Sequence, residues 1–167
     1  MKEKISLSAS LEDYLEAIYH IIEKKLVARS KEIAARLGVS RASVTEALRT
    51  LSKKGLINYE PYEAITMTEL GKEVAEEVVF KHESLKKFFI QVLDIDDETA
   101  ESAACEIEHA APSQVIDRMV SFTAFLKVCP RGGDEFIKGF AEFYEKGRAK
   151  VDCKDCISSC LEFTQND

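Results

Sequence analysis

The stretch that decides the fold is 33-IAARLGVSRASVTEALRTLSKKGLI-57, where two helix-periodic apolar segments flank the turn Leu-Gly-Val-Ser. The first segment has a candidate N-cap at Ser30 and a stop at Gly38, a residue suited to the left-handed conformation that closes helices. Ser40 offers a second N-cap, and the apolar residues of the helix that follows are Val44, Leu48 and Leu51. This order predicts a helix-turn-helix with the second helix in the recognition position.

The flanking segments extend this motif to a winged helix. Upstream, a helix is predicted from about Ser10 to Glu23 by apolar residues at helical spacing: Leu11, Leu15, Ile18 and Ile22. Downstream, two β-prone runs, LINYE at 56–60 and AITMT at 64–68, flank Pro-Tyr-Glu and predict a hairpin. We therefore expect a winged helix-turn-helix DNA-binding domain over residues 1–68.

Charge is distributed unevenly along the chain. The net charge is −7, yet nine basic and only two acidic residues lie between Lys24 and Lys54. A basic segment on an acidic protein is the pattern of a DNA-binding module joined to another domain. An ordinary solvated helical surface would show the same charges, so charge alone leaves both interpretations open.

The recognition helix carries polar side chains on its N-terminal and outward positions. Short hydroxyls and arginine there can reach base edges and phosphates, and the lysines at its far end suit phosphate contact. Each of these side chains could instead be merely solvated. The candidate DNA-binding residues are Ser40, Arg41, Ser43, Thr45, Glu46, Arg49, Lys53 and Lys54.

Helical periodicity continues after the hairpin. A long helix is predicted over 69–93 with Thr68 as its cap, followed by a helix from Glu98 to about Ala110 and another after Ser113. Apolar-faced helices behind a DNA-binding unit predict a dimerisation domain over residues 69–128. A short cysteine-containing helical tail over 129–167 would complete a mainly α protein.

Potential metal ligands are concentrated in CEIEH at 105–109. Cys105, Glu108 and His109 stand at i, i+3 and i+4, so a thiolate, a carboxylate and an imidazole project from one helix face. This mixture of donors suits a divalent transition metal better than Mg(II) or Ca(II). Asp13 and Glu16 form another i, i+3 pair, but each of these residues also has a structural interpretation, such as a packed cysteine or a pair of helix-dipole carboxylates.

Four segments resemble the diphtheria-toxin-repressor family of metalloregulators, especially its short branch with the manganese-transport regulator. They are LEDYLEAIY, the helix-turn-helix, KHESLKKF and CEIEHA, within about Ser8 to Leu126. The resemblance implies a homodimer in which a divalent metal bridges the first helix, the linker helix and the dimerisation helix. It also implies binding to double-stranded palindromic operators and repression of metal-uptake genes.

By position, the resemblance makes six residues metal ligands: Asp13, Glu16, His82, Cys105, Glu108 and His109. Cys105 stands where the iron-responsive branch has cysteine and the manganese branch has glutamate. Since a thiolate is the softer ligand, we expect Fe(II) to be favoured over Mn(II). Lys86 and Glu101 stand where the iron branch has an ancillary carboxylate and imidazole, which argues against a second metal there.

The tail supplies a second group of candidate ligands. Cys129-Pro130 and a C-x2-C-x3-C run together provide four thiols: Cys129, Cys153, Cys156 and Cys160. Four such thiols could hold tetrahedral Zn or a [4Fe–4S] cluster, and redox-active disulfides or ordinary cysteines remain alternatives. The resemblance does not explain this tail.

The remaining features limit the class of protein. No apolar run approaches the roughly 18 residues needed to span a bilayer, and no signal-peptide pattern follows Met1, so we expect a cytoplasmic protein. No nucleophile–base pair or phosphate loop is evident, which argues against an enzyme. The main alternative is a winged-helix regulator that senses redox state or an Fe–S cluster through the tail cysteines; a small metalloenzyme or iron carrier would leave the helix-turn-helix unexplained.

Overall fold

The computed structural model describes residues 6–61, 63–129 and 133–146. Contacts between backbone segments divide the chain into two compact units, residues 1–80 and 81–167. The fold is mainly α, as predicted, with an N-terminal helix-turn-helix and wing followed by helices. In the part of the chain that is described, no helix has the length and apolar character needed to cross a bilayer. The three-domain division at residues 68 and 128 stays a prediction.

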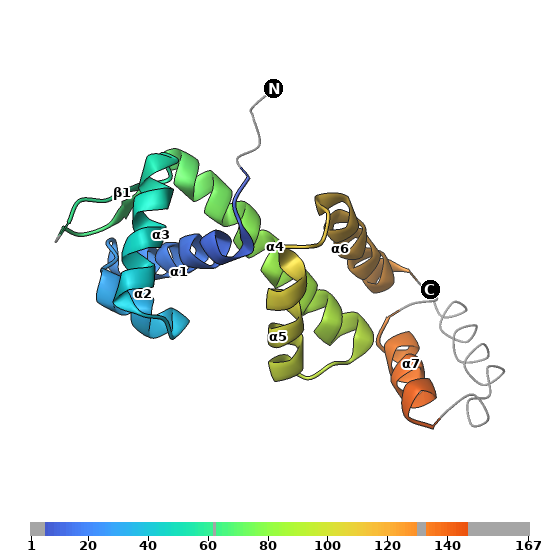
Figure 1. The fold of residues 1–167 in the computed structure, drawn as a ribbon. Coiled ribbons are helices and arrows are strands. Elements are labelled where there is room, and N and C mark those ends of the chain that lie inside the picture. The colour runs from blue at the N-terminus through green and yellow to red at the C-terminus, as the bar shows by residue number, and fades with distance from the viewer. Residues whose placement is uncertain (1–5, 62, 130–132, 147–167) are drawn as a thin grey trace. The chain divides into compact units, whose positions relative to one another are not determined.

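Unit 1 contains the predicted winged helix-turn-helix (Figure 1). Its elements are α1 (Ala9–Lys25), α2 (Ser30–Leu37), α3 (Arg41–Lys53), β1 (Ile57–Asn58) and β2 (Thr66–Met67).

Two of the three predicted helix ends around the turn are confirmed. Gly38 closes α2 with φ of 66°, and the Ser40 hydroxyl accepts a 3.1 Å hydrogen bond from the Ser43 amide at the start of α3. The prediction of Ser30 as N-cap is wrong, because Arg29 caps α2 and Ser30 is already helical. The Glu32 carboxylate accepts a 3.2 Å hydrogen bond from the Arg29 amide, so a first-turn side chain caps the helix instead of Ser30.

The wing is a short antiparallel ribbon. Ile57 pairs with Met67 and Asn58 pairs with Thr66, whose side chains share a 3.0 Å hydrogen bond. An isolated bridge between Ala28 and Ile65 ties this ribbon to the connection that follows α1. The strands are shorter than the β-prone runs in the sequence, because only these residues meet a partner strand.

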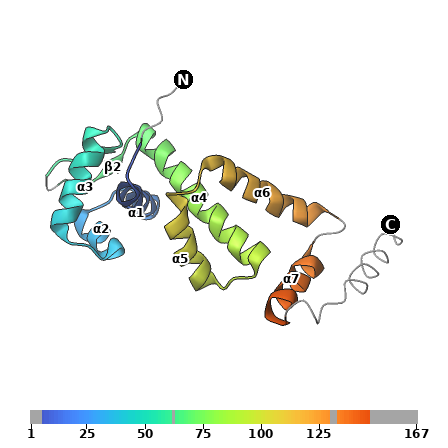
Figure 2. The same cartoon turned by 45° about the vertical axis from the view of Figure 1, so that its right-hand side comes forward.

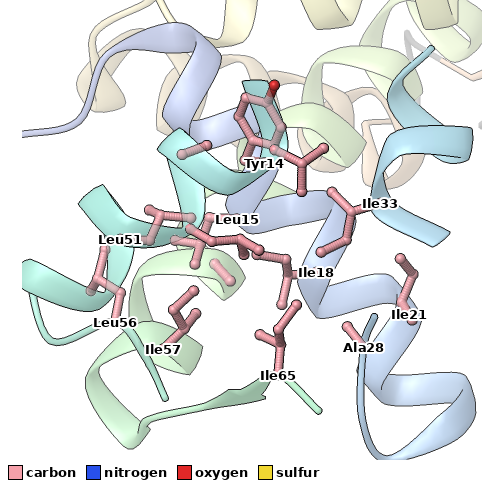
Figure 3. Packing of buried hydrophobic residues seen from close by; sticks show 14 residues of the cluster. Tyr14, Leu15, Ile18, Ile21, Ala28, Ile33, Leu51, Leu56, Ile57 and Ile65 are labelled. Carbon is pink, nitrogen blue, oxygen red and sulfur yellow. The ribbon is translucent and has the colours of Figure 1, made fainter. Parts of the chain in front are cut away.

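One apolar core holds unit 1 together (Figure 3). Side chains from α1, α2, α3 and the wing converge on it, and the most deeply buried include Leu15, Ile18, Ile33, Leu48 and Ile65. Burying a side chain of this kind contributes roughly 1.5–3 kcal/mol. The apolar positions that recur along the sequence thus form this core, and the opposite face of α3 is exposed to solvent.

Helix α4 (Glu69–Leu93) passes through both units, and unit 2 continues with α5 (Asp97–Glu108), α6 (Ser113–Val128) and α7 (Asp134–Lys146). Both α5 and α6 lie beside the C-terminal half of α4 (Figure 2). Their shared core is built from Leu85 and Phe89 of α4, Ala100 and Ala104 of α5, and Ile116 of α6. Ala100 and Ala104 of α5 are fully buried in this core.

Candidate metal centre and nucleic-acid interface

Helix α3 has one buried and one exposed face. Val44, Leu48 and Leu51 are fully buried, which directs the intervening positions to solvent. Seven of the eight predicted DNA-binding residues are exposed: Ser40, Arg41, Ser43, Glu46, Arg49, Lys53 and Lys54. Six of them offer hydroxyls or positive charges, which are the groups that contact phosphates and base edges.

Thr45 and Lys54 are partly engaged within unit 1. Thr45 is half-buried, and its hydroxyl donates a 2.9 Å hydrogen bond to the Arg41 carbonyl. The Lys54 ammonium lies 3.3 Å from the Ser6 carbonyl. Thr45 therefore keeps only acceptor capacity for a base, whereas Lys54 retains donors for a phosphate.

In unit 2, helices α4 and α5 bring two imidazoles to one buried carboxylate. Nδ1 of His82 lies 2.6 Å from Oε2 of Glu108, and Nε2 of His109 lies 3.3 Å from Oε1 of the same residue. His109 is the C-cap of α5 and keeps right-handed helical backbone angles, so it follows Glu108 around the same turn. The predicted ligands His82, Glu108 and His109 are thus brought together.

The Glu108 carboxylate is set in an environment suited to a bound cation. Only 1% of Glu108 is exposed, and its Oε1 accepts no hydrogen bond from any residue that the structure describes. Nε2 of His109 lies 3.3 Å from that oxygen without forming a hydrogen bond to it. Because a buried carboxylate oxygen without a hydrogen bond is costly, this donor set fits a divalent transition metal.

Cys105 lies one helical turn before Glu108 and is exposed. The i, i+3 spacing places it on the same side of α5 as that carboxylate. The short contacts of Glu108 described above are those with the two imidazoles. The role of Cys105 as a ligand remains a prediction.

The other two predicted ligands belong to α1 of unit 1. Asp13 and Glu16 are both half-buried, and Oε1 of Glu16 lies 3.4 Å from Nε2 of His20. His20 did not figure in the sequence prediction, although it stands four residues after Glu16 and so shares its helix face. The imidazole of His20 thus lies beside one oxygen of a predicted metal ligand.

A second polar network lies next to His82. The Lys86 ammonium lies 2.9 Å from Oε2 of Glu101 and 3.0 Å from Oδ1 of Asp97, while Oε1 of Glu101 lies 3.3 Å from Nε2 of His82. Hydrogen bonds to Glu101 and then to Asp97 raise the pKa of Lys86 to about 12, and Lys86 lowers the pKa of Glu101. Lys86 is therefore cationic at any physiological pH.

Of the four tail cysteines, only Cys129 lies within the described residues. It is the half-buried C-cap of α6, in extended conformation. The other three, Cys153, Cys156 and Cys160, lie outside the part of the chain that the structure describes.

Comparison with known proteins identifies the two halves separately. Residues 6–65 match the iron dependent repressor N-terminal DNA binding domain, and residues 68–137 match the iron dependent repressor metal binding and dimerisation domain. An uncharacterised HTH-type transcriptional regulator of Methanocaldococcus jannaschii is 38% identical over 117 residues, which cover 70% of this chain and 94% of that protein. MntR of Oceanobacillus iheyensis is 36% identical over 118 residues, covering 71% of this chain and 80% of that regulator.

A solved structure has a similar fold. A manganese-dependent transcriptional repressor in complex with manganese superposes with a TM-score of 0.64 at 27% identity. The match covers 72% of this chain and 56% of that chain, so this chain spans just over half the length of that repressor. The relatives are transcriptional regulators, which confirms the prediction of a non-enzymatic protein. The chain belongs to the diphtheria-toxin-repressor and MntR family of metal-dependent transcriptional regulators.

Proposed function

We propose that this chain is a repressor whose binding to DNA requires a divalent transition metal. The observation that carries the proposal is the buried Glu108 carboxylate between His82 and His109, with one oxygen accepting no hydrogen bond from the described residues. The proposed ligand set also includes Asp13 and Glu16 of α1 and the Cys105 thiol. These donors would hold a metal that supplies positive charge to the carboxylates.

The ligands come from both units, and this distribution suggests the mechanism. Asp13 and Glu16 belong to unit 1, whereas Glu108 and His109 belong to unit 2. Joining these groups restricts the freedom of one unit relative to the other and selects the conformation that fits DNA. Neutralising the carboxylates also weakens their repulsion of phosphates.

Helix α3 would read the DNA, and unit 2 would pair two copies of the chain. Helix α6 exposes Val115, Phe122 and Phe125 to 46%, 44% and 55%, and exposed apolar side chains grouped on one helix face are typical of an interaction site. Covering this face with a second copy would place two recognition helices on half-sites about 34 Å apart, which requires a palindromic operator. Because the partner is chromosomal DNA, we place the protein in the cytoplasm.

The proposed metal is Fe(II) rather than Mn(II), on the strength of the Cys105 thiol. The solved repressor is manganese-dependent and binds manganese, so the two ions need direct comparison. The tail cysteines would hold a separate Zn ion or [4Fe–4S] cluster. Three of them lie beyond the family matches, which end at residue 137, and the matches give the redox-sensing alternative no support.

The test is anaerobic fluorescence anisotropy with DNA from the upstream region of the protein's own gene, in chelator, in Fe(II) and in Mn(II). We expect binding only with metal, and at a lower concentration of Fe(II) than of Mn(II). Cys105→Glu should move this preference towards Mn(II), because a hard oxygen replaces the soft thiolate. Equal DNA binding in chelator and in metal would contradict metal control, and an unmoved preference in Cys105→Glu would contradict the argument for iron.

Arg41→Ala tests the position of α3 on DNA. Arg41 is exposed in the first turn of the recognition helix, and we expect its loss to weaken operator binding by about ten- to a hundredfold. The matched control is Lys72→Ala, which removes one positive charge from the same unit. The Lys72 side chain is 57% exposed, and its ammonium lies 3.8 Å from Oε1 of Glu76. Titrations with operator DNA and with scrambled DNA should show that Arg41→Ala alone loses the preference for the operator. If Arg41→Ala and Lys72→Ala bound both DNAs with the same affinities, α3 would not lie in the major groove.

A further inference from the structure

The Lys86 network resembles a cation-binding site in which the Lys86 ammonium is the bound cation. His82 and Lys86 are four residues apart on α4, and Asp97 and Glu101 are four residues apart on α5, so each pair shares a helix face. The Lys86 ammonium is held by carboxylates at 2.9 and 3.0 Å, distances typical of charge-assisted hydrogen bonds.

His82 connects this network to the metal centre of the proposed function. Its Nδ1 faces Glu108 at 2.6 Å, and its Nε2 faces Glu101 at 3.3 Å. A histidine that binds a metal through one nitrogen commonly uses the other to contact a carboxylate, which fixes the orientation of the ring. Glu101 has this position, and Lys86 holds Glu101 in turn.

We propose that the Lys86 ammonium takes the place of a divalent ion on the Glu101 side of His82, so that metal binds only on the Glu108 side of the imidazole. Without Lys86, the carboxylates of Asp97 and Glu101 together with Nε2 of His82 would form a set of hard and borderline donors. The ammonium neutralises these carboxylates permanently and repels another cation. Glu101 thereby becomes a positioning residue for His82 rather than a metal ligand.

This inference rests on the proposed metal centre and is tested by counting ions in the full-length protein. Mn(II) is the suitable probe, because the tail thiolates prefer softer metals and because its electron paramagnetic resonance spectrum distinguishes isolated ions from coupled pairs. Under anaerobic reducing conditions, the Mn(II) count and the spectrum of the unaltered chain give the reference for the centre on the Glu108 side of His82.

Lys86→Glu should bind one Mn(II) ion per chain more than the unaltered chain, and the added ion should broaden the spectrum by interacting with the metal on the other side of His82. Lys86→Gln, which removes the charge and keeps most of the length, should also bind this additional ion, but more weakly. The control is Lys87→Glu, the same change at the adjacent exposed position, which should leave the count of the unaltered chain unchanged.

The outcomes separate this inference from the proposed function. Binding of no Mn(II) by the unaltered chain would overturn both. An additional ion in Lys86→Glu and not in Lys87→Glu supports the inference, whereas an unchanged count in both Lys86 variants overturns only the role of Lys86. Lys86→Gln keeps most of the length of the lysine, so the inference can still fail if Lys86→Glu does not fold.

Discussion

Replacing Glu108 with glutamine is expected to abolish the dependence of DNA binding on metal. Glu108 is 1% exposed and stands between His82 and His109, so an uncharged amide there removes the one carboxylate that both imidazoles share. The stimulation of operator binding by metal should fall by about 100-fold, near the upper end of couplings between two sites. Anisotropy titrations in chelator and in excess Fe(II) measure this ratio directly.

Glu106→Gln is the matched control for that experiment. Glu106 lies on the same helix, is exposed, and loses the same charge, so metal stimulation should stay at the level of the unaltered chain. The fold of Glu108→Gln should persist in chelator, because glutamine has nearly the size of glutamate and its amide can still hydrogen-bond to the imidazoles. Retention of full metal stimulation by Glu108→Gln would show that the metal binds elsewhere.

Gly71→Ala is expected to disrupt unit 1 more than any ordinary surface change. A Cβ at Gly71 would lie 1.8 Å from the carbonyl oxygen of Leu56, so the first turn of α4 would have to move away from the wing. The same carbonyl accepts a 3.0 Å hydrogen bond from the amide of Thr68, which caps α4 by accepting a 3.0 Å hydrogen bond from the Gly71 amide. The methyl group therefore breaks a junction that is already closed by hydrogen bonds.

We expect Gly71→Ala to lower the free energy of unfolding by about 3 kcal/mol, the upper end of ordinary overpacking costs. For a unit of this size, that corresponds to a Tm lower by roughly 12 °C or more in calorimetry. Gly139→Ala is the control, because a Cβ there meets no described atom within 4 Å and alanine favours helix α7. A Gly71→Ala protein that melted with the unaltered chain would contradict the close approach of α4 to the wing.

Local order was predictable from the sequence because its causes are local. The periodicity of Val44, Leu48 and Leu51 specifies which face of α3 is buried, and the caps at Gly38 and Ser40 specify where the turn lies. The same reasoning failed at Ser30, because either of two adjacent residues could be the N-cap of α2. The hydrogen bond from the Arg29 amide to the Glu32 carboxylate makes Arg29 the N-cap.

The assignment of ligands could be predicted only in part. Spacing placed Glu108 and His109 on one helix face, but the need to add His82 came from resemblance, since 26 residues separate it from Glu108. Lys86 appeared in the sequence only as a residue that cannot bind a metal. Its contacts with Asp97 and Glu101, and the contact of Glu101 with His82, involve two helices.

The sequence by itself therefore determined the helices, their apolar faces, the winged helix-turn-helix and the types of donor available to a metal. Only the tertiary structure decided that Glu108 is buried and that its Oε1 accepts no hydrogen bond from the described residues. It also decided that Glu101 contacts both His82 and the Lys86 ammonium. The reason is physical. Periodicity and capping act within one helix, whereas burial and ion pairing depend on which helices the apolar side chains bring into contact.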